Sequence, residues 1–205
     1  MRIDDFNKHL RRFPTWPVYL LGFGWAVWLF WLGFSGKLGP EPVQALEHRY
    51  GELALQLLIL GLAVTPLRRF LGLNLLKFRR AFGLLAFFYV TVHLTVWFAL
   101  DLSLRWDAIL ADIVKRPYIT VGMVAFAGLI PLAATSTNRA IRKLGPRWRQ
   151  LHKLVYPIAG LAGIHYIMVQ KVWETEPLIY LVVVLCLIGL RFLPRQKASG
   201  VIANG

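Results

Sequence analysis

The strongest constraint on this chain is a series of long apolar runs without charge. Residues 16–34 contain no Asp, Glu, Lys or Arg and are rich in Trp, Leu and Phe, and residues 81–100 and 117–138 are likewise uncharged. A helix needs about 20 predominantly apolar residues to cross a bilayer, and about 17 are tolerated. Overall, 57% of the residues are hydrophobic and 17% are charged, whereas soluble domains average about 45–50% and about 25%. The sequence therefore predicts an all-α integral membrane protein.

Three weaker apolar segments extend the series. Residues 53–67 are uncharged but follow a charged stretch, residues 154–170 follow a basic connection, and residues 178–190 are short unless Phe192 and Leu193 extend them. The connections between all these runs are short, which favours antiparallel packing of neighbouring helices. We therefore expect a bundle of six transmembrane helices.

Lys and Arg predict the orientation of this bundle. Eighteen of the 24 basic residues lie in residues 2–12, 68–80, 139–153 and 191–197, which fall on one side if six spans alternate. Lys and Arg concentrate in cytoplasmic loops, so both termini are expected in the cytoplasm. The Lys and Arg residues that set the orientation thus account for the net charge of +14, and a nucleic-acid partner is not expected. No short apolar segment with a cleavage site begins the chain, so the first span is expected to stay as an anchor.

The segments outside the spans carry few further signals. Residues 1–15 form a basic arm, and the small, polar residues 194–205 are expected to be a disordered tail. In the outer connection, residues 101–116, apolar side chains recur at helical spacing, which predicts a short amphipathic helix on the membrane surface. That helix is either a simple connector or a docking surface for an extracytoplasmic partner. Cys186 is the single cysteine, so it forms no intrachain disulfide or cysteine cluster.

Two histidines fall at similar depths within the apolar runs. His93 lies about 18 Å along the third predicted span and His165 about 21 Å along the fifth, both measured from the cytoplasmic side. An ionisable side chain inside a membrane indicates a functional site, and imidazole is the commonest metal ligand in proteins. Two imidazoles on facing helices at one depth could hold a haem iron from both faces. The pattern therefore predicts a haem between His93 and His165.

A second haem would need His152, which lies about 19.5 Å closer to the cytoplasm than His165. Thirteen residues leave these two side chains about 140° apart around an ideal helix, although Pro157 between them could change the phase. Arg79 stands where an opposing histidine would be expected. Arginine is always protonated and is a poor iron ligand, but it could pair with a haem propionate. The residues predict one haem and leave the second open.

Other interpretations remain open at this point. Intramembrane histidines can simply hydrogen-bond a neighbouring helix, and we expect His48 to be solvated at an interface and His9 to lie on the surface. A small proton-coupled transporter could use His93 and His165 as a relay, but the third, fourth and fifth spans contain no Asp or Glu. A non-redox membrane scaffold gives no reason for two histidines at equal depth.

Several motifs resemble those of a known family. They are Phe78-Arg79-Arg80-Ala81-Phe82-Gly83-Leu84, the segment from Lys115 to Gly122, the segment from Leu144 to Tyr156 with Trp148 and His152, and Thr65-Pro66-Leu67-Arg68. Together they resemble the MsrQ (YedZ) family, the haem-binding membrane subunits of the bacterial MsrPQ methionine sulfoxide reductase system. The wider group is the ferric-reductase-like transmembrane domain, which would span residues 16–193 here.

This resemblance implies a function that spacing alone does not. The chain would bind haem b, with FMN as a further cofactor, in the bacterial inner membrane. It would pass electrons from the quinone pool, or from a cytosolic flavin reductase, to periplasmic MsrP, a molybdopterin enzyme that reduces methionine sulfoxide in oxidised proteins. The haem histidines of the family correspond to His93, His152 and His165, whereas Arg79 departs from the wider group. The chain itself would carry no catalytic site for sulfoxide reduction and no nucleotide-binding domain.

Overall fold

A computed structural model describes residues 3–170, 172 and 174–193, and every regular element in these residues is helical. The elements in chain order are α1 (Ile3–Arg12), α2 (Trp16–Phe34), α3 (Pro42–Phe70), the short η1 (Leu76–Phe78), α4 (Arg79–Val96), the π-helical η2 (Trp97–Asp101), α5 (Trp106–Lys115), α6 (Pro117–Ala134), α7 (Asn138–Leu144), α8 (Pro146–Leu151), the short η3 (His152–Leu154), α9 (Val155–Val169) and α10 (Thr175–Gly189). The predicted all-α class is confirmed.

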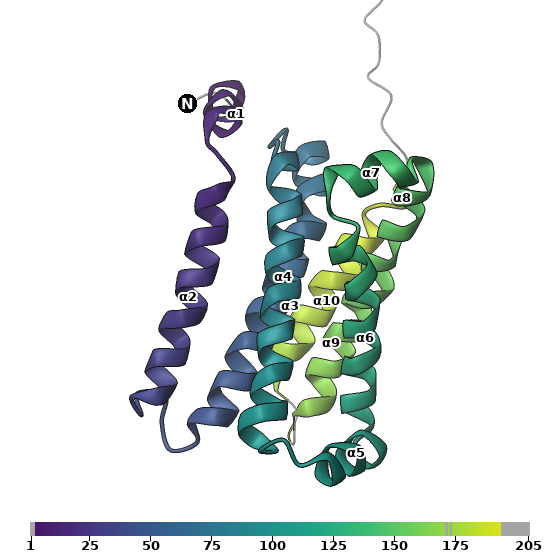
Figure 1. Cartoon of the computed structure of the whole chain (residues 1–205). Helices are drawn as coiled ribbons and strands as arrows, with labels where there is room; N and C mark the ends of the chain where they lie inside the picture. The colour runs from purple at the N-terminus through teal and green to yellow at the C-terminus, as the bar shows by residue number, and fades with distance from the viewer. Residues whose placement is uncertain (1–2, 171, 173, 194–205) are drawn as a thin grey trace, which may run out of the picture.

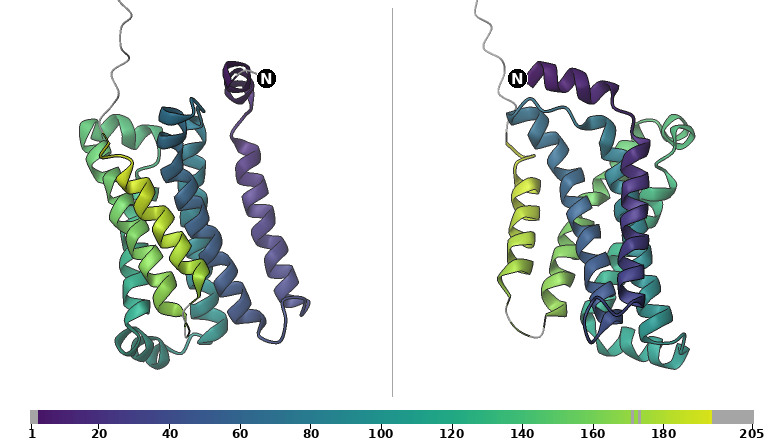
Figure 2. Two further views of the ribbon diagram at one scale, coloured as in Figure 1. Left: turned by 180° about the vertical axis from the view of Figure 1, so that it is seen from behind. Right: turned by 90° about the vertical axis from the view of Figure 1, so that its left-hand side faces the viewer.

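The long helices stand side by side in a bundle (Figure 1). The closest pairs are α3 with α4 and α6 with α9, and α10 packs against α9 and α3. Helix α2 lies at the edge of the bundle, as Figure 1 and the left view of Figure 2 show. Two tyrosines tie it to the rest, because Tyr50 Oη donates to the Ala26 carbonyl at 2.8 Å and Tyr89 Oη donates to the Gly22 carbonyl at 2.6 Å.

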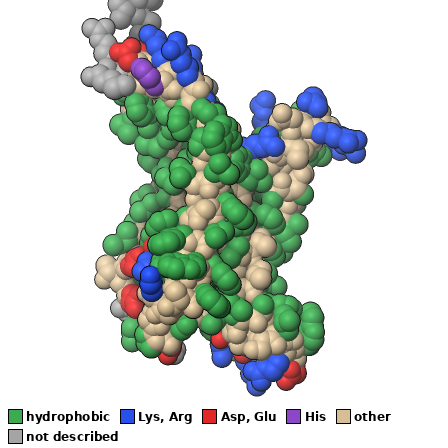
Figure 3. All heavy atoms as spheres, turned by 60° about the vertical axis from the view of Figure 1, so that its left-hand side comes forward, with side chains coloured by type: hydrophobic (Ala, Val, Ile, Leu, Met, Phe, Trp, Pro, Cys, Tyr) green, Lys and Arg blue, Asp and Glu red, His purple; other side chains and the backbone are tan. Residues whose placement is uncertain are grey.

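Within the part of the chain that the structure describes, four helical segments are long and apolar enough to cross a membrane: Trp16–Phe34, Pro42–Phe70, Leu76–Asp101 and Pro117–Ala134. Helices α9 and α10 have 15 residues each, which is shorter than the length of about 20 residues that a span usually needs. On the face drawn in Figure 3, hydrophobic side chains cover the middle of the bundle, and Lys and Arg gather at the end that carries α1. This surface is typical of a membrane protein.

Two predicted boundaries were wrong. The fourth apolar run was expected to continue to residue 138, but α6 ends at Ala134. The chain turns there because Thr137 caps α7, its side chain accepting a hydrogen bond from the Ala140 backbone N–H. The second run was expected to start at residue 53, but α3 starts at Pro42 and includes the charged stretch before that run.

The connection between η2 and α6 contains a shorter helix than predicted. The expected amphipathic segment, residues 101–116, forms a helix only as α5, because Ser103 and Leu104 adopt positive φ angles of 48° and 58° in the turn before it. Within α5, Ile109 is buried, while Leu110 and Val114 are exposed. At the other end of the bundle the basic arm forms helix α1 (Figure 1). The predicted disordered tail, residues 194–205, lies outside the described residues.

Candidate functional site

His93 and His165 project into the bundle from two different helices. His93 is in α4 and His165 is in α9. Each ring reaches across to the backbone of a neighbouring helix: Nδ1 of His93 lies 2.8 Å from the Glu47 carbonyl on α3, and Nδ1 of His165 lies 2.7 Å from the Tyr118 carbonyl on α6. A carbonyl can only accept, so each Nδ1 carries the proton and donates it. The unprotonated nitrogen of both rings is therefore Nε2, the one that can bind a metal.

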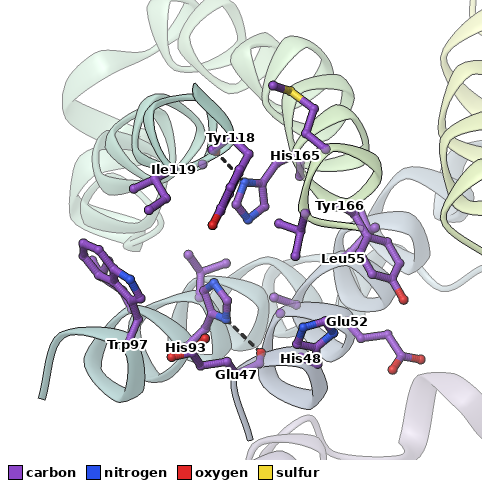
Figure 4. Close-up of a pocket in the computed structure, with 18 of the residues that line it drawn as sticks. Glu47, His48, Glu52, Leu55, His93, Trp97, Tyr118, Ile119, His165 and Tyr166 are labelled. Carbon is purple, nitrogen blue, oxygen red and sulfur yellow. Dashed lines mark hydrogen bonds between the residues drawn. The ribbon is translucent and has the colours of Figure 1, made fainter. Parts of the chain in front are cut away.

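The two rings face each other across a gap. Their centroids are 6.4 Å apart and their planes cross at 83°. The nitrogen of each ring that makes no hydrogen bond points toward the other ring (Figure 4). The sequence predicted that these residues share a depth, and the structure brings them together.

The rings lie in a cavity of about 1120 Å³. Apolar residues such as Leu58, Leu129 and Ile158 line its inner part, which we call the floor. Its mouth is the part lined by Glu41, Asp101 and Glu174, which lie where α3 and α10 begin and where η2 ends. Among the described residues that line it, Arg116 is the sole Lys or Arg. Ligand pockets usually measure about 300–1,000 Å³, so this cavity suits a large, mainly apolar group with polar substituents near its mouth.

A haem fits these dimensions. A metal–imidazole bond is about 2.0–2.1 Å long and a ring centroid lies about 1.2 Å behind its nitrogen, so two imidazoles that face each other across one metal have centroids about 6.4–6.6 Å apart. In residues 3–170, 172 and 174–193, no cluster of three or more His, Cys, Asp or Glu could hold a bare metal ion. A porphyrin needs only axial ligands from the protein, and two histidines can supply both.

Neither His152 nor Arg79 lines this cavity. His152 is in η3. Its Nε2 lies 3.0 Å from Thr135 Oγ1, and the Trp148 ring stacks on it with centroids 4.0 Å apart. Burial, and then the nearby charge of Arg79, lower the pKa of His152. Pro157 falls in the first turn of α9, where its missing N–H breaks no helical hydrogen bond, so the helix is not kinked there to bring His152 toward His165.

The remaining histidines divide between the cavity and the surface. His9 is exposed, as predicted, and its Nδ1 lies 2.8 Å from the Asp5 carbonyl. His48 is half-buried and belongs to the lining of the cavity (Figure 4). Its helix, α3, begins earlier than predicted and turns this residue toward the bundle. The carbonyls of Glu47 and Tyr118 were missed, because a backbone acceptor leaves no mark on the sequence.

Comparisons with known proteins show the family to which the chain belongs. The family described as ferric reductase like transmembrane component matches residues 50–163. Proteins named protein-methionine-sulfoxide reductase heme-binding subunit MsrQ, from Brucella ovis, Brucella canis and Brucella suis, are each 50% identical over 177 residues. The aligned part is 86% of this chain and 80% of each relative. The chain therefore belongs to the MsrQ family, within the ferric-reductase-like transmembrane proteins.

Proposed function

We propose that this chain is a haem b electron-transfer subunit of a methionine sulfoxide reductase system. The observation that carries the proposal is the pair of imidazoles, His93 and His165, with centroids 6.4 Å apart in a large apolar cavity. Relatives at 50% identity are named as heme-binding subunits of protein-methionine-sulfoxide reductase, which supports the same conclusion. Bound haem would supply reversible one-electron transfer, and the protein would supply position and surroundings.

Different residues of the cavity would have different roles in binding the haem. His93 and His165 would hold the haem iron through Nε2, each ring oriented by a backbone carbonyl that accepts from Nδ1. Such a hydrogen bond fixes the tautomer and raises the basicity of the ligating nitrogen. The apolar floor at Leu58, Leu129 and Ile158 excludes water. Arg116, at the mouth, is positioned to pair with a carboxylate of the cofactor.

The direction of transfer follows from the proposed topology. We place six spans in the bacterial inner membrane as the domain 16–193, with α9 and α10 as the short fifth and sixth, and both the arm 1–15 and the tail 194–205 in the cytoplasm. The mouth of the cavity then faces the periplasm, where MsrP would take electrons. The donor would be the quinone pool or a cytosolic flavin reductase, and FMN enters as a further cofactor of the family.

A second haem would depend on His152 and Arg79, which lie within electrostatic range of each other at the cytoplasmic end. Nε2 of His152 lies 3.0 Å from a Thr135 hydroxyl, and Arg79 would serve a propionate rather than the iron. We therefore propose one haem in the cavity, between His93 and His165.

The first test measures haem in the purified chain. We expect a Soret band, a reduced α-band and about one haem b per chain, because two axial histidines hold one iron. His152→Ala should keep this haem, since His152 does not line the cavity. Added MsrP should reoxidise the reduced protein. A folded protein without colour would reject the function, and a ratio that falls from two to one in His152→Ala would assign a second haem to that residue.

A second test concerns docking of MsrP at α5. Asp107 is exposed on this helix, whereas Asp112 lies 3.3 Å from Arg116 and would disturb the cavity if replaced. Charges at the rim of an interface act mainly on association rates, so Asp107→Lys should slow electron delivery to MsrP by at least about threefold at low salt without loss of haem. Asp5→Lys, at the opposite end, is the matched control. Stopped-flow reoxidation measures both, and equal rates in the two variants would exclude docking at α5.

A further inference from the structure

Both imidazole rings rest against a glycine of the neighbouring helix. A Cβ at Gly51, on α3, would lie 3.2 Å from Nδ1 of His93. A Cβ at Gly122, on α6, would lie 2.9 Å from both Nδ1 and Cε1 of His165. Separations under 3.0 Å essentially never occur for a real Cβ, so a side chain at Gly122 would have to displace the ring.

Each of these glycines lies one helical turn after the residue whose carbonyl accepts the hydrogen bond from the histidine ring. Glu47 stands four residues before Gly51, and Tyr118 stands four residues before Gly122. Residues four apart lie one above the other on the same face of an α-helix. A ring whose Nδ1 and Cε1 lie against the glycine can therefore reach the carbonyl one turn earlier, as both rings do. The pairs α3–α4 and α6–α9 thus repeat one local arrangement on opposite sides of the cavity.

Other glycines of the same helices contact no histidine. A Cβ at Gly128, on α6, would meet Cδ1 and Cγ1 of Ile158 at 2.9 Å, and a Cβ at Gly61, on α3, would meet nothing within 4 Å. Ile158 can change rotamer to relieve such a contact. His165 is more restricted, because a hydrogen bond to the Tyr118 carbonyl fixes one side of its ring and the opposite nitrogen faces His93.

We infer that Gly51 and Gly122 are positioning residues for the two haem ligands, an inference that rests on the proposed function. The missing side chain lets each imidazole lie against the helix backbone and donate from Nδ1 to the carbonyl one turn earlier. This contact sets the direction of Nε2 and the 83° angle between the ring planes. Gly122 is the tighter of the two positions, so its replacement has the larger effect.

The test compares Gly122→Ala and Gly51→Ala with two alanine variants whose added Cβ would meet nothing within 4 Å, Gly61→Ala on α3 and Gly160→Ala on α9. Loss of the groups that orient a ligand typically costs about 10–100-fold in metal affinity, so Gly122→Ala should retain roughly tenfold less haem through purification. Gly51→Ala should keep most of its haem but change its ferric EPR signal and midpoint potential, because the hydrogen bond from Nδ1 of a ligating histidine tunes the iron. The two controls should match the wild type in all three measurements.

The outcomes separate this inference from the proposed function. A wild-type chain without haem would overturn both. Wild-type haem content and an unchanged EPR signal in Gly122→Ala would overturn the role of the glycines alone. If Gly122→Ala does not accumulate in the membrane, Gly51→Ala decides, because a wild-type EPR signal and potential in that variant would likewise reject the inference.

Discussion

Replacing either His93 or His165 by alanine should abolish the stable haem of the purified protein. The two rings are the pair that faces across the cavity, with centroids 6.4 Å apart. Removing one leaves the iron with a single protein ligand in an apolar cavity, and the affinity should fall by well over about tenfold, since even the loss of an outer-shell partner costs about 10–100-fold. The absorbance ratio of the Soret band to the protein band, measured after identical purification, gives the result.

Two comparisons make this experiment specific. His48→Ala removes a third imidazole from the lining of the same cavity. This variant should keep the haem, because His48 is not one of the two rings that face each other. Added imidazole should restore the Soret band of His165→Ala, because the truncated side chain leaves room for a free ligand. A normal Soret band in both His93→Ala and His165→Ala would show that the iron is bound elsewhere.

The sequence predicted that His93 and His165 share a depth, but it could not predict that their rings face each other. Depth follows from counting residues along each helix, which needs only the rise of about 1.5 Å per residue. Whether the two rings face each other depends on which helices pack together and on the carbonyls of Glu47 and Tyr118, which hold the rings in place. These are backbone groups on helices distant in sequence, so residue type carries no record of them.

The prediction for the second apolar run shows a different limit. Hydropathy places a boundary at residue 53, because several charged residues precede it. The helix nevertheless starts at Pro42, since helix formation needs only one buried face. Leu46 and Tyr50 form that face and are 3% and 1% exposed, while Arg49 points outward. The part of α3 that contacts His93 was therefore outside the predicted span.

His152 was also only partly predictable. Its phase, about 140° from His165 on an ideal helix, already indicated that the two would not share a face. The structure separates them further, because His152 falls in η3 before α9 begins. Its contacts with Thr135 and Trp148 depend on how α6 ends, and that boundary was the one that the apolar pattern extended too far.

The second large prediction concerns the orientation of the bundle in the membrane. If both termini are cytoplasmic, the turn after α2 and the mouth of the cavity face the periplasm, while α7 and α8 face the cytoplasm. The chain has one cysteine, Cys186, so a Cys186→Ala protein can report on any single cysteine added to it. Ser35→Cys and Gln150→Cys place an exposed thiol at opposite ends without changing the charge that sets orientation.

A membrane-impermeant maleimide should label Ser35→Cys in intact spheroplasts and leave Gln150→Cys unlabelled, with a difference of at least about tenfold, because a bilayer-spanning bundle exposes only one end to the reagent. After lysis both should be labelled equally, which controls for the reactivity of each thiol. Labelling of Gln150→Cys alone in intact spheroplasts would show that the bundle has the opposite orientation in the membrane. The cavity between His93 and His165 would then open to the cytoplasm, and electrons could not leave through its mouth to a periplasmic acceptor.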